Sequence, residues 1–319
     1  MKTTTASHFR AGACAVALLA GLAASAASAQ SITLLSGSAG GTWTALSGTL
    51  KSMLEREVPG MDVRIRPGVA LANIKGVSAG MAEIGWMLAD SANDALAGRP
   101  PFGEPVTNLC EIAAFHPTVL HFMTTDPDVE KIADIAGHRV GTLPRGSGSD
   151  TAFVTVLGLS GLDEDDVQRD FAAQGDLPNM MKDGHIDVWS QLSGVPGGAV
   201  ADLFSSSGQA RFLPISDQLV EDLHAVNPAW RREIIPAGTY PGQDEEVGAV
   251  GFLTHIGANC DTLSEEDAYA ITKTLIANYA EMGSVNHSIG QLSVPDLARD
   301  VGLPLHPGAR RAYEEAGAL

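Results

Sequence analysis

Positively charged residues are scarce in this sequence. Its 319 residues include 20 Lys and Arg against 38 Asp and Glu, which gives a formal net charge of −18. A protein that binds nucleic acid needs basic patches to neutralise phosphates, and adhesion to anionic lipid needs basic residues as well. The acidic balance therefore excludes nucleic acid as a partner and argues against binding to an anionic membrane surface.

Long apolar runs and metal-binding motifs are scarce as well. Beyond residue 29 no stretch reaches ~18 uninterrupted apolar residues, so we expect no transmembrane helix and no direct membrane insertion of the mature chain. Neither H-E-x-x-H nor C-x-x-C occurs, and we expect neither a metal nor a cofactor. The hydrophobic content of 45% is far above that of a disordered chain, and the length is enough for about two domains.

Residues 1–29 have the pattern of a secretory signal peptide. A basic start with Lys2 and Arg10 precedes an apolar run over 11–24, and Ala27-Ser28-Ala29 is an A-x-A cleavage site. We therefore expect cleavage before Gln30 and export to the periplasm. The alternative, an N-terminal membrane anchor, is disfavoured because the run is short and rich in alanine. Cleavage removes two basic residues and no acidic one, so the net charge of −18 becomes −20.

Cleavage also leaves two of the three cysteines, Cys110 and Cys260. An oxidising compartment permits a disulfide between them. Cysteine is also often simply buried, and the sequence does not show whether the two Cα atoms lie close enough to be bridged. The pairing is therefore open at this point.

Short β-rich runs alternate with segments of helical periodicity. The first series predicts strands over 32–35, 63–66 and 84–88 and helices over 43–54 and 70–81. The second predicts strands over 138–143, 186–191, 210–215 and 247–255 and helices over 149–160, 218–225, 264–279 and 308–316. This order is typical of parallel strands joined by crossover helices, so we expect an α/β fold.

The C-terminal elements show no separate core, and we expect them to pack on the first series. This arrangement predicts a signal peptide over 1–29, a first lobe over 30–115 plus 246–319, and a second lobe over 116–245. The chain then crosses twice between the lobes, and the two crossings form a hinge.

Each series contains a glycine-rich turn from a strand into a helix, over 36–42 and over 144–150. The N-terminus of a helix favours an anion, because its N–H groups are unpaired and the positive end of the helix dipole lies there. Two such turns on facing lobes are suited to hold a small anionic organic solute between them. The alternative is that both are ordinary turns with N-caps, and neither matches a phosphate-binding fingerprint.

Catalytic patterns are thin. Ser147 lacks the glycine that G-x-S-x-G requires two residues earlier, because Arg145 occupies that position. His116 and His121 lie five residues apart in an extended segment, which places them on opposite faces of a strand. Arg145 can pair with a carboxylate in a bidentate manner, although an exposed arginine in a loop is equally ordinary. We therefore do not expect an enzyme.

Several segments follow one another in the order of a known family's motifs. Gly40-Gly41-Thr42-Trp43 is similar to the opening G-G-T-Y-Y-P-L-G segment of the TAXI-type solute-binding proteins of tripartite ATP-independent periplasmic (TRAP) transporters. Gly146–Asp150 resembles the G-S-G-T-E turn of that family. The most specific segment is 235–247, which reads IPAGTYPGQDEEV. Further similar segments are ADIAGHRV at 133–140, KDGHID at 182–187, GVP at 194–196 and LHPGA at 305–309.

This resemblance implies a two-lobed periplasmic-binding-protein fold of the second type, in which each lobe is a mainly parallel sheet flanked by helices and the ligand cleft lies between the lobes. It implies capture of a small carboxylate (glutamate, a dicarboxylate or an oxoacid) and delivery to a separate TRAP membrane permease. By motif position, the resemblance implies ligand contacts at Gly40, Gly41, Thr42, Trp43, Leu88, His116, Arg145, Ser147, Gly148 and Ser149.

Four positions depart from the family's pattern. Trp43 and Thr44 stand in place of two tyrosines, Leu88 in place of a glutamine, and His116 in place of a tyrosine. A pocket changed in this way forms fewer hydrogen bonds and accepts more apolar surface. We therefore expect a carboxylate that is less polar than glutamate.

Two other interpretations stay open. One is an exported α/β hydrolase or transferase, which needs a nucleophile with an oriented base. The other is a sensor module, in which the same binding protein presents its ligand to a membrane receptor. A hydrolase screen tests the first, and a receptor gene beside this one indicates the second.

Overall fold

The computed structural model of the protein describes residues 1–3, 30–37 and 41–319. Most of the predicted signal peptide, residues 4–29, therefore lies outside the described residues. Gly40 lies outside them as well. The strands are β1 (Gln30–Leu35), β2 (Met61–Arg66), β3 (Ile84–Leu88), β4 (Leu109–Thr124), β5 (Arg139–Thr142), β6 (Gln168–Phe171), β7 (Val188–Ser193), β8 (Arg211–Phe212), β9 (Arg231–Ile235) and β10 (Val247–Asn259).

Helices flank this sheet on the described part of the chain. They are α1 (Thr42–Glu57), α2 (Ala70–Ser78), α3 (Ala89–Leu96), α4 (Gly148–Leu159), α5 (Leu177–Lys182), α6 (Gly198–Ser206), α7 (Asp217–Val226), α8 (Glu265–Asn278), α9 (Val294–Leu297) and α10 (Pro307–Glu315). Short 3-10 helices lie at η1 (Ile132–Ile135), η2 (Glu164–Asp166), η3 (Tyr279–Ser284) and η4 (Ile289–Gln291). None of the described helices is both long and apolar enough to cross a membrane.

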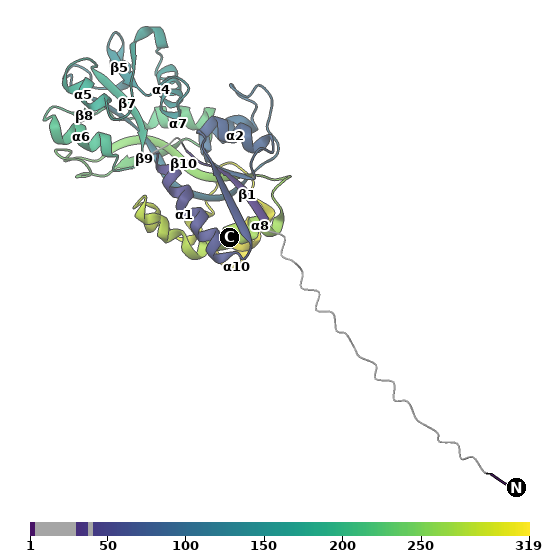
Figure 1. The fold of residues 1–319 in the computed structure, drawn as a ribbon. Coiled ribbons are helices and arrows are strands. Elements are labelled where there is room, and N and C mark those ends of the chain that lie inside the picture. Colours follow the sequence, from purple (N-terminus) through teal and green to yellow (C-terminus); the bar gives the residue numbers. More distant parts are fainter. Residues whose placement is uncertain (4–29, 38–40) are drawn as a thin grey trace.

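One mixed sheet runs through the molecule in the order β2-β1-β3-β10-β4-β7-β5-β6, with β8 beside β4 and β9 beside β10. The outer strands pair in parallel, β1 with β2 and β3, and β5 with β6 and β7. We call the half built around β1–β3 the β1 side and the half built around β5–β7 the β5 side. Figure 1 shows α1, α8 and α10 at one end of the molecule and α5 and α6 at the other.

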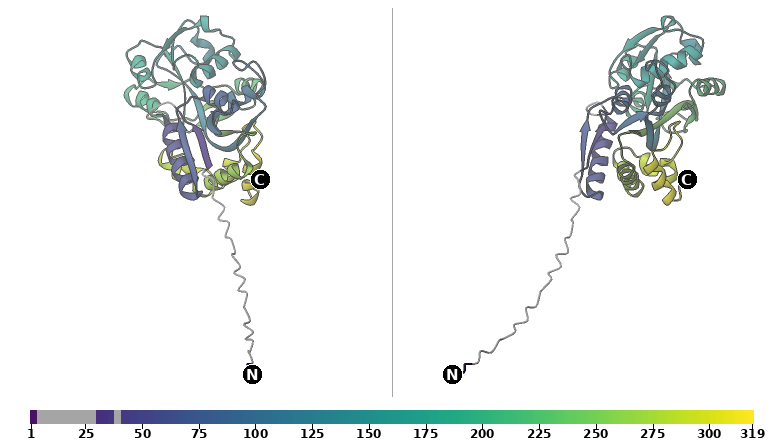
Figure 2. Two further views of the ribbon diagram at one scale, coloured as in Figure 1. Left: turned by 45° about the vertical axis from the view of Figure 1, so that its right-hand side comes forward. Right: turned by 90° about the vertical axis from the view of Figure 1, so that its right-hand side faces the viewer.

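The two long strands β4 and β10 join these halves. They pair antiparallel from Leu109 opposite Asn259 to Leu120 opposite Val250. Toward the β1 side, β10 also pairs with β3, and toward the β5 side β4 pairs with β7. Both views in Figure 2 show the teal elements of the β5 side at one end of the molecule and purple and yellow elements of the β1 side at the other. The sheet is mixed because these two connecting strands pair antiparallel with their neighbours.

The hydrophobic core follows the same division. One buried cluster on the β1 side includes Leu50, Trp86 and Tyr313, and one on the β5 side includes Trp189 and Tyr240. Helices α8 and α10 pack on each other, and α8 also packs on α1. A third buried cluster contains residues of both halves.

Most predicted elements are present with boundaries within a few residues. The predicted strand over 210–215 is wrong in extent, because only Arg211 and Phe212 pair with β4. The helical periodicity of 264–279 is confirmed, and Ser264 caps that helix by accepting from the backbone N–H of Asp267. The sequence pattern predicted no helix at α3, α5 or α6 and no strand at β6 or β9, and it did not predict the sixteen-residue length of β4. The α/β fold class is confirmed.

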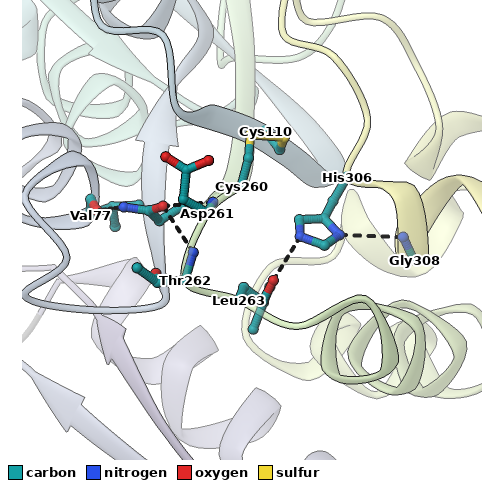
Figure 3. The surroundings of a disulfide bond; sticks show 9 residues. Val77, Cys110, Cys260, Asp261, Thr262, Leu263, His306 and Gly308 are labelled. Carbon is teal, nitrogen blue, oxygen red and sulfur yellow. Dashed lines mark hydrogen bonds between the residues drawn. A yellow bond between two sulfur atoms is a disulfide. The ribbon is translucent and has the colours of Figure 1, made fainter.

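Cys110 and Cys260 form a disulfide, which answers the question that the sequence left open. Their Cα atoms are 5.4 Å apart, within the range that a disulfide spans. Cys110 lies near the start of β4, and Cys260 directly follows β10, where its N–H donates to the carbonyl of Asn108. Figure 3 shows the pair beside the turn 260–263, whose Leu263 carbonyl contacts His306.

Candidate ligand cleft

A cleft of about 770 Å³ lies between the β1 side and the β5 side. Its walls come from the starts of α1, α2, α4 and α6, the ends of β3 and β7, the middle of β4 and β10, and an irregular segment between η3 and η4. The side chains and backbone that line it are Gly37, Gly41, Thr42, Trp43, Gly68, Val69, Ala70, Leu88, His116, Thr118, Leu143, Gly148, Ser149, Gln174, 192–198, Thr254, 285–288 and Gln291.

Four helix N-termini meet at this cleft. Helices α1, α2, α4 and α6 begin at Thr42, Ala70, Gly148 and Gly198, and all four residues line it. The first N–H groups of a helix have no carbonyl partner within that helix. Helices α1, α2 and α6 have neither a side-chain cap nor an acidic residue in the first turn. Their positive dipole ends are therefore directed at the cleft without a local counter-charge.

The wall of the cleft is otherwise without formal charge. Of the described residues that line it, none is Lys, Arg, Asp or Glu. The apolar part consists of Trp43, Val69, Ala70, Leu88, Leu143, Leu192, Val195, Pro196 and Val285. Polar side chains between them supply hydroxyl, amide and imidazole groups. Such a wall suits an anion with an apolar body.

His116 is the most deeply buried titratable group on the wall. Its side chain is only 7% exposed, and its Nδ1 has no hydrogen-bond partner among the described residues. Burial lowers the pKa of His116 to about 4, so the ring is neutral at pH 7. A neutral imidazole offers one donor and one acceptor. His116 is therefore suited to bind a polar group of a ligand without adding charge.

Hydrogen bonds within the β5 side fix the start of α4. Ser149 Oγ accepts from the backbone N–H of Leu192 at 3.0 Å, which ties α4 to the end of β7. Asp150 Oδ2 accepts from the N–H of Gly146 at 2.8 Å. Across the cleft, a Cβ at Gly148 would lie 3.0 Å from Cδ1 of Leu88. A side chain at this position would therefore press on the end of the Leu88 side chain, which would have to shift by a few tenths of an ångström.

Seven of the predicted contact residues line the cleft together: Gly41, Thr42, Trp43, Leu88, His116, Gly148 and Ser149. Gly40 lies outside the described residues. Arg145 lies outside the lining, because its guanidinium pairs with Glu164 at 2.7 Å and stacks on the ring of Phe171. Ser147 also lies outside the lining, since its Oγ caps α4 by accepting from the N–H of Asp150.

Sequence patterns missed several parts of the wall, including Gly68, Val69 and Ala70 at the start of α2. The segment Ser193-Gly194-Val195-Pro196-Gly197-Gly198 is a third glycine-rich turn from a strand into a helix, and the same composition signal was available for it. The segment 285–288 is different. It is irregular chain between η3 and η4, and no periodicity or motif marks it.

One serine–histidine pair lies at the wall, and it is not arranged as a nucleophile and its base. Ser193 Oγ lies 3.3 Å from Nδ1 of His121, which is itself 2.9 Å from the carbonyl of Val119. A carbonyl only accepts hydrogen bonds, so Nδ1 carries the hydrogen and has no lone pair to take a proton from Ser193. His116 lines the cleft and His121 does not. The described residues contain no cluster of His, Cys, Asp and Glu that fits a metal ion.

Comparison with known proteins adds the family. A model of the NMT1-like family matches residues 34–317. The chain belongs to the NMT1-like family. The periplasmic aliphatic sulphonate binding protein SsuA from Escherichia coli has a similar structure, with a TM-score of 0.50 and 16% sequence identity over 90% of this chain and 83% of that one. A TRAP periplasmic solute binding protein from Roseobacter denitrificans with bound β-D-glucuronate matches at a TM-score of 0.46 and 12% identity, covering 91% of this chain and 87% of that one.

The likeness to SsuA concerns the fold. This member of the NMT1-like family has the two-lobed architecture of periplasmic binding proteins, as the sequence predicts. Four finer statements are proposals: the assignment to the TAXI type, the TRAP permease as partner, the carboxylate as ligand, and the boundaries of the lobes.

Proposed function

We propose that this NMT1-like protein is a periplasmic solute-binding subunit that captures a small organic anion in the cleft and delivers it to a membrane transporter. The observation that carries the proposal is the convergence of four helix N-termini on a cleft whose described lining has no charged side chain. Unpaired N–H groups at the uncapped starts of α1, α2 and α6 bind an anion without a basic residue. Lobes 30–115 plus 246–319 and 116–245 then close on it around β4 and β10.

The ligand class follows from the wall. We assign a carboxylate with an apolar body, because Trp43, Leu88 and Leu192 supply apolar surface beside the helix N-termini. The motifs shared with TAXI-type proteins support a TRAP permease as the partner. The chain's negative charge does not draw such a ligand in from a distance, so the local N–H groups provide the attraction.

A thermal-shift panel on the mature protein tests the ligand class. We expect 4-methyl-2-oxopentanoate to raise the unfolding temperature more than glutamate, succinate or 2-oxoglutarate, and choline to leave it unchanged. A ligand at 100 times its Kd adds about 2.7 kcal/mol to apparent stability. Tight glutamate binding with no preference for the less polar acid contradicts the ligand class. No response to any anion contradicts the proposed function.

Gly148→Asp tests the place of the site. The new carboxylate stands at the first residue of α4, where it suits the helix dipole, but it repels an anion and meets Leu88 across the cleft. We expect affinity for 4-methyl-2-oxopentanoate, measured by calorimetry, to fall at least 100-fold while the fold is retained. Gly158→Asp is the matched control, because that glycine lies in the same helix with open space around its Cβ position. Equal affinities of the two variants would move the site elsewhere.

A further inference from the structure

The longest continuous piece of the cleft wall is the segment 192–198, from the end of β7 to the start of α6. Gly197 is the N-cap residue of α6 and makes no side-chain cap. Its own N–H donates to the hydroxyl of Tyr240 at 2.8 Å. The place of this helix N-terminus therefore depends on a side chain from the loop between β9 and β10, which lies behind the wall.

Tyr240 in turn is bonded to His121. Its Oη lies 3.0 Å from His121 Nε2, and Nδ1 of the same ring lies 2.9 Å from the carbonyl of Val119. Burial lowers the pKa of His121 to about 4, so at neutral pH the ring carries a single N–H. Because that hydrogen is on Nδ1, Nε2 accepts from the Tyr240 hydroxyl. The hydroxyl oxygen is then free to accept from Gly197.

The ring of Tyr240 is fixed independently of its hydroxyl. It is 2% exposed and packs against Phe204 and Phe212, with ring centroids 5.5 Å and 5.4 Å away. His121 also packs against Phe212 at 5.8 Å and is fully buried. On the cleft side, His121 Nδ1 lies 3.3 Å from Oγ of Ser193, a lining residue. The pair thus contacts both ends of the loop 193–197.

We propose that Tyr240 and His121 are positioning residues of the cleft. One directed series of hydrogen bonds, from Gly197 to Tyr240 to His121 and on to the carbonyl of Val119, holds the N-terminus of α6 and Ser193 where they face the bound anion. This inference rests on the proposed function for what is bound. The arrangement of the wall itself is measurable without any ligand.

Tyr240→Phe keeps the packed ring and removes the hydroxyl, so Gly197 N–H and His121 Nε2 both lose their partner. We expect at least 10-fold faster hydrogen exchange in a peptide covering 194–200 of the ligand-free mature protein. We also expect about 10-fold weaker binding of 4-methyl-2-oxopentanoate with cooperative unfolding retained. Tyr313→Phe is the control, because that buried hydroxyl donates to the carbonyls of Ile112 and Leu297 on the β1 side.

His121 variants separate positioning from a merely structural role. The carbonyl oxygen of His121→Gln can still accept from the Tyr240 hydroxyl, so we expect affinity within about 2-fold of the wild type. His121→Leu has no acceptor and is expected to match Tyr240→Phe. The double variant Tyr240→Phe/His121→Leu then binds no more weakly than either single variant, because both changes break the same series of bonds.

The inference is overturned if Tyr240→Phe has the hydrogen-exchange rate at 194–200 and the affinity for 4-methyl-2-oxopentanoate of the wild type. It is also overturned if Tyr313→Phe changes both quantities as much as Tyr240→Phe does. If Tyr240→Phe does not fold, the comparison of His121→Gln with His121→Leu decides, and equal affinities of these two overturn it. A wild-type protein that binds no anion contradicts the proposed function alone. In that case the exchange rates at 194–200 still confirm or contradict the role of Tyr240.

Discussion

An Arg169→Met variant is expected to unfold with a free energy about 3–5 kcal/mol below that of the wild type, because it leaves a buried charge without its partner. The side chain of Arg169 is 4% exposed, and its guanidinium forms an ion pair with Asp150, whose side chain is 9% exposed. It also donates to Glu164 and to Thr142 Oγ1, each at 2.8 Å. Without the arginine, the buried Asp150 carboxylate has lost its charged partner and keeps only the hydrogen bond from the N–H of Gly146.

Packing adds to the loss. The guanidinium carbon of Arg169 lies 4.6 Å from the ring centroid of Phe153 and 4.8 Å from that of Phe171, so the cation is held between two aromatic rings. Asp150 in turn accepts from the N–H of Gly146 and lies in the first turn of α4. We therefore expect Arg169→Met to weaken anion binding as well, because the α4 end of the cleft loses its support.

Urea unfolding of the mature protein measures this effect. Arg64→Met is the control, because Arg64 pairs with Asp62 at the surface, where their side chains are 67% and 48% exposed. An exposed pair of this kind contributes about 0–1 kcal/mol. A second variant, Arg169→Met/Asp150→Asn, removes both charges and is expected to recover part of the loss. Equal destabilisation by Arg64→Met and Arg169→Met would contradict the argument.

The ion pairs of Glu164 explain why the sequence predicted the turn over 144–150 but not the place of the Arg145 side chain. Glycine, serine and the strand-to-helix rhythm predicted that residues 144–150 form a helix start, and Gly148 and Ser149 do line the cleft. The partner of Arg145 is Glu164, nineteen residues later in the acidic run 163–166. Local composition is enough to predict the turn over 144–150. The direction of the Arg145 side chain depends instead on Glu164, a distant charge that the fold brings beside it.

The fold was predictable for a related reason. Helix periodicity and strand alternation are local properties, so α1, β3, α4 and α8 could be located from the sequence. The pairing of β4 with β10 is not local, because it joins Leu109 to Asn259 across the whole β5 side. Cys110 and Cys260 were the one sequence feature that pointed to this pairing, and cysteine content alone does not show which residues are neighbours.

The disulfide provides the second large effect. A Cys110→Ala/Cys260→Ala variant is expected to lose about 5 kcal/mol of unfolding free energy, because the bond closes a loop with a sequence separation of 150 residues and long loops restrict the unfolded chain most. Much of the native contact remains without it. Cys110 stands in the β4–β10 ladder, and the N–H at position 260 still donates to the carbonyl of Asn108. The loss therefore arises mainly in the unfolded state.

Two measurements separate this origin from damage to the native fold. In urea, the double variant should show a larger m-value than the oxidised wild type, because an unfolded chain without the cross-link exposes more surface. Its affinity for 4-methyl-2-oxopentanoate is expected to stay within about 2-fold, since neither cysteine lines the cleft. An unchanged m-value together with weakened binding contradicts the unfolded-state argument. That result would mean that the bond instead holds β4 and β10 in the register from which His116 and Thr254 reach the cleft.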